Sequence, residues 1–316
     1  MKKYYSAVLF LGLTAGLFSA CDNDEEVVPD APQVSIENLS GTIHCSTNGT
    51  VSLKAQLANS TQEVSFLWFD NQKEVSMDSI FEFTSTEIGI HNITLLASNP
   101  GGKDSDTLQL NVYQPLSIND IVNWTGIGEN RSVLAIQWVT GEVEDLLNPD
   151  DENIFFRAWG YRWKAGEEKT GIEMIKAIVK QDPRLYMVYN TSWDMVTGFI
   201  YDRDNDKKIH ISNGTIDLTQ DDFEEGIYYA ESTVNFDNLQ VGGEDLWLGG
   251  SENAYASYFT FDDSPSIPEQ FEYAQVGVAL RPLTNNSWDV YTFSPQNAEW
   301  LNTNPHPYLL EAAEAN

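Results

Sequence analysis

Apolar and polar residues alternate in short runs along residues 33–113, which is the pattern of half-buried β-strands. Asn, Gly, Ser and Pro separate the runs. Six or seven strands within about eighty residues are typical of a β-sandwich. The runs cover residues 34–36, 50–57, 64–69, 80–83, 91–97 and 107–112.

A second region follows the boundary at Tyr113-Gln-Pro115 and extends over residues 115–316. Most of its apolar runs also alternate with period two, so we expect this region to be mainly β, with sandwich-like sheets. The runs cover residues 132–138, 153–163, 185–189, 197–201, 226–229, 246–248, 254–261, 273–280 and 289–293.

One amphipathic helix is predicted near residues 170–182. Thr170 and Glu173 have the spacing of a capping box. The apolar residues at 174, 175, 178 and 179 fall on one face of a helix. Asp182-Pro183 ends it, because proline disfavours helical geometry in the residue before it. We expect this helix to pack on a sheet.

The chain begins with a predicted secretory signal peptide over residues 1–20. Lys2 and Lys3 precede an apolar run that ends at Phe18 and is too short to span a membrane. The segment Leu17-Phe-Ser-Ala-Cys21 resembles the lipobox of bacterial lipoproteins. This resemblance implies that Cys21 is lipidated, with palmitate among the acyl chains. The protein would then be held on the membrane through the lipid anchor alone.

Residues 21–32 are acidic, contain two prolines and lack periodicity, so we interpret them as a linker after the lipidated Cys21. The segment Asp22-Asn-Asp-Glu-Glu26 resembles the export signal of surface lipoproteins in Bacteroidota. That resemblance implies an outer-membrane lipoprotein exposed on the cell surface. The alternative is a solvated tether that is acidic by chance.

Charge excludes nucleic acid as a partner. The 316 residues contain 48 Asp and Glu against 17 Lys and Arg, a net charge of −31. A polyanion would be repelled, because phosphate binding needs clustered cations. With Cys21 acylated, Cys45 has no cysteine partner, and we predict that it is a small core residue.

Residues 33–114 resemble PKD/immunoglobulin-like modules of extracellular proteins. Trp68 stands where those modules have a buried tryptophan, residues 89–95 resemble their Gly-x-Tyr/His-x-Val-x-Leu strand, and residues 99–108 resemble their Asn-x-Gly-Gly hairpin. The segment Trp68-Phe-Asp-Asn71 departs from the Gly-Asp-Gly turn common in the PKD branch. The resemblance implies a spacer with Trp68 in its core.

Eight of the nine tryptophans lie beyond residue 115. This excess over the needs of a core, together with loop contexts such as Ser192-Trp193-Asp194, predicts exposed aromatic rings that bind a ligand. The candidate ligand-binding residues are Trp159, Trp163, Arg157, Trp193 and Trp247.

The segment Asp202-Arg-Asp-Asn-Asp206 places carboxylates at alternate positions, the spacing with which a tight loop surrounds calcium. Asp202, Asp204 and Asp206 are therefore the candidate calcium ligands. Lys207 and Asn213 depart from the EF-hand pattern, and the alternative is a charged hairpin turn. No other cofactor is expected, and the sequence lacks the His and Cys clusters of a transition-metal site.

Nucleophilic hydrolysis has little support. His210 is the one plausible base among the four histidines, and no Gly-x-Ser-x-Gly segment occurs. We therefore expect a binding protein rather than an enzyme.

Residues 120–190 resemble a domain of secreted and lipidated Bacteroidota proteins with the patterns Trp-Gly-Tyr-Arg-Trp-Asp-Gly, Thr-Gly-x-x-Met and Asp-Pro-Arg-Leu. Here Lys164-Ala165 replaces Asp-Gly. In architecture the chain resembles two-domain surface lipoproteins that capture corrinoids. That resemblance implies capture of cobalamin or another corrinoid for an outer-membrane transporter. The alternatives are a glycan-binding lipoprotein of a polysaccharide-utilisation system, a surface hydrolase, and a structural adhesion protein.

Overall fold

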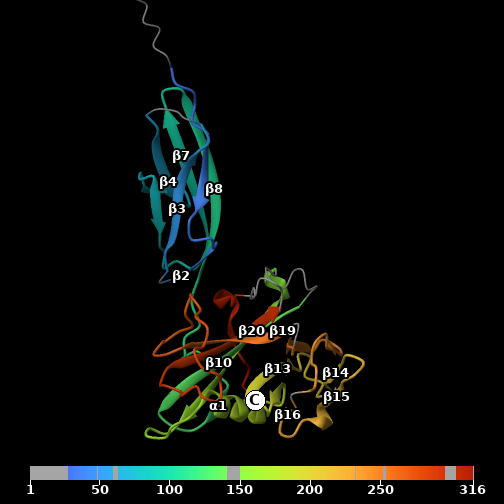
Figure 1. The fold of residues 1–316 in the computed structure, drawn as a ribbon. Coiled ribbons are helices and arrows are strands. Elements are labelled where there is room, and N and C mark those ends of the chain that lie inside the picture. Colours follow the sequence, from blue (N-terminus) through green and yellow to red (C-terminus); the bar gives the residue numbers. More distant parts are fainter. Residues whose placement is uncertain are drawn as a thin grey trace, which may run out of the picture.

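The computed structural model describes residues 28–47, 49–59, 63–140, 150–231, 233–251, 254–295 and 304–315. The predicted signal peptide, Cys21 and Trp300 lie outside these residues. The fold is mainly β and consists of two parts that follow each other along the chain (Figure 1). The mainly β fold class predicted from the sequence is confirmed.

The first part is a sandwich of two sheets. One sheet has the strand order β1-β3-β6 and the other β2-β8-β7-β4-β5. Trp68 is fully buried between them, and its indole Nε1 donates to the carbonyl of Asp78 at 2.8 Å. Cys45 is a buried free thiol in the same core, as predicted. The strands are β1 (Val34–Asn38), β2 (His44–Ser46), β3 (Val51–Leu57), β4 (Ser65–Asp70), β5 (Lys73–Ser76), β6 (Ile80–Phe83), β7 (Gly89–Asn99) and β8 (Gly102–Tyr113).

This strand order is immunoglobulin-like. The first, third and sixth strands form one sheet, while the hairpin β7–β8 joins the pair β4–β5 in the other, as in the two-sheet immunoglobulin arrangement. The first described residues lie at the end of the sandwich far from the second part, and β2 lies at the end facing it (Figure 1).

The second part stacks several β layers. A six-stranded sheet with the order β19-β20-β10-β11-β21, in which β9 also pairs with β11, faces a four-stranded sheet with the order β16-β12-β13-β18. A small sheet, β15-β14-β17, covers the far side of the four-stranded sheet through a separate apolar cluster. The strands are β9 (Trp124–Gly126), β10 (Asn130–Val139), β11 (Ile154–Trp163), β12 (Leu185–Asn190), β13 (Met195–Tyr201), β14 (His210–Ser212), β15 (Asp217–Thr219), β16 (Ile227–Ala230), β17 (Gln240–Val241), β18 (Leu246–Gly249), β19 (Ala254–Phe261), β20 (Ser287–Pro295) and β21 (Glu311–Ala312). Three short 3-10 turns are η1 (Asp151–Asn153), η2 (Gln220–Asp222) and η3 (Pro307–Leu309).

The predicted helix is confirmed as α1 (Gly171–Gln181). Thr170 caps it, the capping box with Glu173 is formed, and Met174, Ile175, Ile178 and Val179 are buried. These side chains join the core between the six-stranded and four-stranded sheets. Among the described residues, no helix is long and apolar enough to cross a membrane.

Residues 273–280, which the alternation predicts as a strand, form turns instead. The segment runs past the N-terminus of α1, where the amide of Gly171 donates to the carbonyl of Arg281 and that of Ile172 to the carbonyl of Val278. The first amides of a helix have no partner within it, so this segment satisfies them. The strand prediction is wrong here because the carbonyls of Val278 and of Arg281, the residue after the segment, bind the end of a helix instead of a neighbouring strand.

Candidate functional site

Two of the predicted aromatic contacts lie in the core of the second part. The side chains of Trp159 and Trp163 are only 1% and 3% exposed. Both belong to β11, and their face of the six-stranded sheet packs in the cluster that includes α1. Neither ring reaches the surface, so the expectation that they contact a ligand is corrected to a role in the core.

Trp159 also belongs to a buried polar network centred on Asp182. Its indole Nε1 donates to Asp182 Oδ2 at 2.7 Å, and Asn123 Nδ2 donates to the same oxygen at 3.1 Å. The amide of Arg184 donates to Asp182 Oδ1 at 3.0 Å. Asp182 is 1% exposed. The Asp-Pro-Arg-Leu and Trp-Gly-Tyr-Arg-Trp segments therefore meet in a network that holds β11 to the end of α1.

Gly160 serves the same packing. A side chain there would collide with the Trp124 ring, because an added Cβ would lie 2.3 Å from Trp124 Cε3. The Arg162 guanidinium lies over that ring at 4.4 Å from its centroid. The motif thus stacks two strands and an indole rather than forming an open site.

Arg157, a predicted ligand contact, is engaged within the protein. Its guanidinium pairs with Glu311 of β21 at 2.8 Å and lies 4.0 Å from the centroid of the Phe155 ring. These contacts tie β21 to β11 and leave the side chain 23% exposed. The main contacts of Arg157 therefore connect β11 with β21.

The other two predicted contacts differ from each other. Trp193 is 64% exposed, in the loop between β12 and β13, where Asn190 Oδ1 accepts from its backbone amide at 3.1 Å. Trp247 is partly buried, against Phe236 and over Gly198. Trp193 alone among the described tryptophans is strongly exposed, so the aromatic excess is mainly a property of the core.

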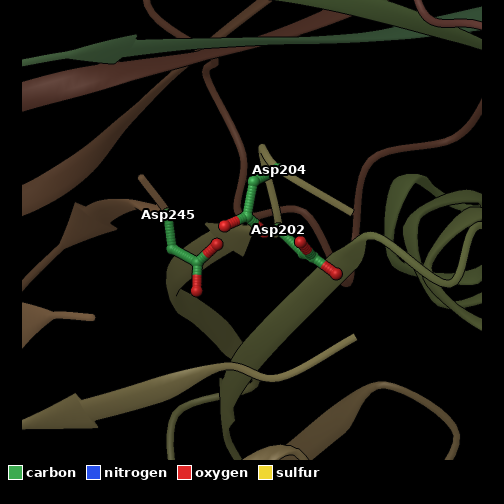
Figure 2. Close-up of side chains that lie close together, drawn as sticks. All are labelled: Asp202, Asp204 and Asp245. Atoms are coloured by element: carbon green, nitrogen blue, oxygen red, sulfur yellow. The ribbon is translucent and has the colours of Figure 1, made fainter. Parts of the chain in front are cut away.

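Three aspartates lie close together where β13 ends and the neighbouring strand β18 begins. The antiparallel register pairs Tyr201 with Leu246, which sets Asp202 opposite Asp245, one residue beyond the ladder. Asp204 follows in the turn after Asp202. Carboxylate oxygens of Asp202, Asp204 and Asp245 all lie within 4.8 Å of one another. Figure 2 shows the three carboxylates, two from one segment and Asp245 from another.

Two of these carboxylates are buried. Asp202 is fully buried and Asp245 is 7% exposed. Burial, and then the charge of Asp202, raise the pKa of Asp245 to about 6. Burial also raises the pKa of Asp202, although backbone amides of the turn donate to it. Like charges placed opposite each other in a sheet destabilise it. The group therefore favours a bound proton or cation.

Hydrogen bonding is incomplete at this group. Asp202 accepts from the backbone amides of Asp206 and Lys207. Asp245 Oδ1, in contrast, is buried without a hydrogen-bond partner within the described part of the chain. A buried acceptor without a partner costs about 1–3 kcal/mol. This group could hold a metal ion.

The set of ligands differs from the sequence prediction in one member. Asp206 is not in the group: its carboxylate accepts from the amide of Lys208 and lies 3.6 Å from Lys208 Nζ. Asp245 takes the place predicted for Asp206. Asp245 replaces Asp206 because the pairing of β13 with β18 brings Asp245 to Asp202, although the two residues are distant in the sequence. The turn itself directs the carboxylate of Asp206 away from the group.

The candidate base His210 lies on the rim of the small sheet. Its Nε2 pairs with Asp217 Oδ1 at 2.6 Å, and the two side chains are 57% and 78% exposed. This pair joins β14 to β15. His210 lies opposite Thr219 and reaches diagonally past the Ile211–Leu218 pair to Asp217. The geometry is that of a surface pair across two strands.

Comparison with known proteins finds no matching family model and no similar curated protein. Similar solved structures include a quinonprotein alcohol dehydrogenase-like protein from Bacteroides thetaiotaomicron, at 19% identity and a TM-score of 0.22, over 28% of this chain and 21% of that one. The PKD1 domain of the Vibrio cholerae metalloprotease PrtV matches at 20% identity and a TM-score of 0.18, over 27% of this chain and 98% of that one. A titin I-band fragment matches at 11% identity and a TM-score of 0.24, over 83% and 96%. The immunoglobulin-like description of the first part rests on its own strand order.

Proposed function

We propose that the second part binds calcium at Asp202, Asp204 and Asp245. The observation that carries this proposal is the buried Asp245 Oδ1, which has no hydrogen-bond partner among the described residues and lies in a group with two other carboxylates. At 4.8 Å and an effective dielectric constant of about 20, two such charges repel each other by about 3 kcal/mol. A divalent cation removes this repulsion and supplies the missing partner.

Calcium suits the donors better than other metals. All three are hard carboxylate oxygens, which excludes a preference for zinc or copper. Calcium accepts six to eight oxygen ligands in variable geometry, so waters and backbone carbonyls can complete its shell. Magnesium demands a near-ideal octahedron and keeps most of its waters. A group built at the ends of two paired strands and in a turn fits the more tolerant ion.

Calorimetric titration of chelator-stripped protein tests this proposal. We expect one calcium ion to bind per chain, with Asp204→Asn abolishing the heat. The matched control is Asp206→Asn, which changes a carboxylate of the same turn that lies outside the group and should leave binding unchanged. Absence of heat at millimolar calcium, loss of binding in the control but not in Asp204→Asn, or equal affinity for magnesium would overturn the assignment.

We also propose that this protein is a lipid-anchored binding protein of the outer cell surface, which captures a nutrient for an outer-membrane transporter. Support comes from the lipobox-like segment at Cys21 and from the architecture. The described chain begins at the end of the sandwich far from the second part (Figure 1). A lipid on Cys21 would therefore leave the second part directed away from the membrane.

The ligand expected from the sequence is a corrinoid, with a glycan as the alternative. Burial of Trp159 and Trp163 removes two of the aromatic contacts on which the corrinoid expectation relied. Trp193 remains as an exposed ring. Equilibrium dialysis with cyanocobalamin tests the corrinoid, and affinity electrophoresis in polysaccharide gels tests the glycan. If the protein binds neither ligand, the proposal of nutrient capture is contradicted.

A further inference from the structure

A cavity of about 650 Å³ lies between the two parts of the molecule. From the sandwich it is lined by residues 40–45, Thr50 and Tyr113, and from the second part by residues 269–270 and 304–308. Small-molecule sites have volumes of roughly 300–1,000 Å³ and favour domain interfaces. The cavity therefore has the size and place of a ligand site.

Aromatic contacts define one wall of this cavity. The rings of His44 and Tyr308 stack with their centroids 3.4 Å apart and their planes 7° apart. Tyr113 meets the Tyr308 ring edge-on at 6.0 Å. The Tyr308 hydroxyl donates to Asp151 at 2.7 Å. Both parts of the chain thus contribute fixed rings to the wall.

A carboxylate closes the junction on another side. Glu269 Oε1 accepts from the amide of Ser46 at 3.2 Å. It reaches this position because residue 49 is glycine: an added Cβ would lie 2.5 Å from Glu269 Oε1. The cavity is therefore framed by direct contacts between the two parts.

The lining chemistry excludes an anion. Among the described residues that line the cavity there is no lysine or arginine, and Glu269 is an acid in a chain of net charge −31. Burial lowers the pKa of both His44 and His306, so these imidazoles are neutral at pH 7. An anionic ligand would have no counter-charge here.

The same lining suits a neutral ligand rich in hydroxyl groups. Asn111 Nδ2 donates to His44 Nδ1 at 3.4 Å, which places the proton of the neutral ring on Nε2 as a donor. Side chains of Thr42, Gln270 and Asn304 add both donors and acceptors. Hydroxyl groups of a sugar can donate and accept, and such a mixed lining satisfies both.

We infer that this cavity binds a neutral carbohydrate segment. The inference rests on the proposed capture function, and it names the site and the ligand class. A whole corrinoid, with its macrocycle, amide arms and nucleotide tail, is larger than the drug-sized ligands that cavities of this volume enclose. The volume therefore favours a short glycan over a corrinoid.

Affinity electrophoresis of the full chain tests the inference, with gels that contain starch, galactomannan, xyloglucan or arabinoxylan, and polygalacturonate as the anionic control. We expect retardation in at least one neutral gel and none in polygalacturonate. Thr42→Trp fills the cavity from its exposed rim and should abolish the retardation. The matched control Ser105→Trp changes an exposed hydroxyl side chain of β8, which the strand register pairs with Leu96, toward the end of the sandwich away from the lining residue Tyr113. This variant should keep the retardation.

The outcomes separate the site from the function. Retardation that persists in Thr42→Trp overturns the cavity as the site and leaves glycan capture standing. Binding of cyanocobalamin without any retardation in the neutral gels overturns the ligand class and leaves nutrient capture standing. If neither ligand binds, both the inference and the proposed capture function fail. Equal circular dichroism spectra of the two Trp variants and the wild type exclude misfolding as the cause.

Discussion

Replacing Asp245 with asparagine should stabilise the calcium-free protein while abolishing its response to calcium. The pKa of Asp245 is about 6 in the folded protein, against 3.8 for the ordinary group. A carboxyl whose pKa is higher folded than unfolded binds more protons in the folded state between these values. Its ionisation therefore destabilises the fold as pH rises through 6, by up to about 3 kcal/mol at pH 7.

The asparagine amide has the size of the carboxylate and carries no charge. Its N–H groups can donate to Asp202 and Asp204, so the substitution removes repulsion without leaving a buried donor unsatisfied. At about 2–4 °C per kcal/mol for a domain of this size, we expect the calcium-free Tm of the variant to rise by about 6–12 °C at pH 7. The increase should vanish near pH 4, where wild-type Asp245 is protonated.

Thermal unfolding followed by tryptophan fluorescence reports on the second part, which contains eight of the nine tryptophans. With EDTA, the variant should unfold at the higher temperature. With calcium at about 100 times its dissociation constant, the wild type should gain about 2.7 kcal/mol and the variant nothing. Asp206→Asn is the control and should behave as the wild type. A variant that is less stable than the wild type in EDTA at pH 7 would refute the repulsion on which the calcium site depends.

Three further predictions concern the second part. Calcium affinity should fall about ten-fold between pH 7 and pH 5, because protons compete with the ion for Asp245, whose pKa is about 6; an affinity independent of pH in titration calorimetry would contradict this. Asp182→Ala leaves Trp159 Nε1 and Asn123 Nδ2 without their buried acceptor, so the free energy of unfolding in urea should fall by about 3 kcal/mol, and a loss below about 1 kcal/mol would refute the network. Thr170→Ala removes the cap of α1 and should cost about 1 kcal/mol in the same assay, whereas an unchanged midpoint would show that the cap contributes nothing.

Features with local causes were predictable from the sequence. The helix α1 was predicted with its cap, its buried face and its end, because each of these features depends on residues that are close together in the sequence. The sandwich followed from the alternation, and the burial of Trp68 was implied by the resemblance of residues 33–114 to PKD/immunoglobulin-like modules. The strand predicted at 273–280 failed because the carbonyls of Val278 and of Arg281, the residue after the segment, accept from the first amides of α1, a contact made across the fold.

Burial was harder to predict than strand position. Alternation shows that Trp159 and Trp163 share a face but does not show whether that face is covered. In this fold both faces of β11 are covered: Phe156 and Ala158 pack in a second cluster on the opposite side. A tryptophan in a strand of a multilayer fold is therefore a poor candidate for a ligand contact, whereas Trp193 in its loop is exposed, as its sequence context predicted.

The candidate metal site was half predictable. Asp202 and Asp204 lie in one turn, and their spacing indicated a cation site. Asp245 is distant in the sequence and reaches the group only because β18 pairs with β13. In the sequence, Asp245 stands directly before the strand-like run at 246–248. This position indicates a metal ligand only when the register between β13 and β18 is known.

The most direct test of the calcium site is a crystal structure of the protein grown with calcium. We predict one ion with Asp202, Asp204 and Asp245 oxygens at about 2.3–2.6 Å, the range for calcium ligands. The carboxylate of Asp206 should remain beside Lys208. An ion held by Asp206 in place of Asp245, or a group that stays free of metal at saturating calcium, would contradict the account.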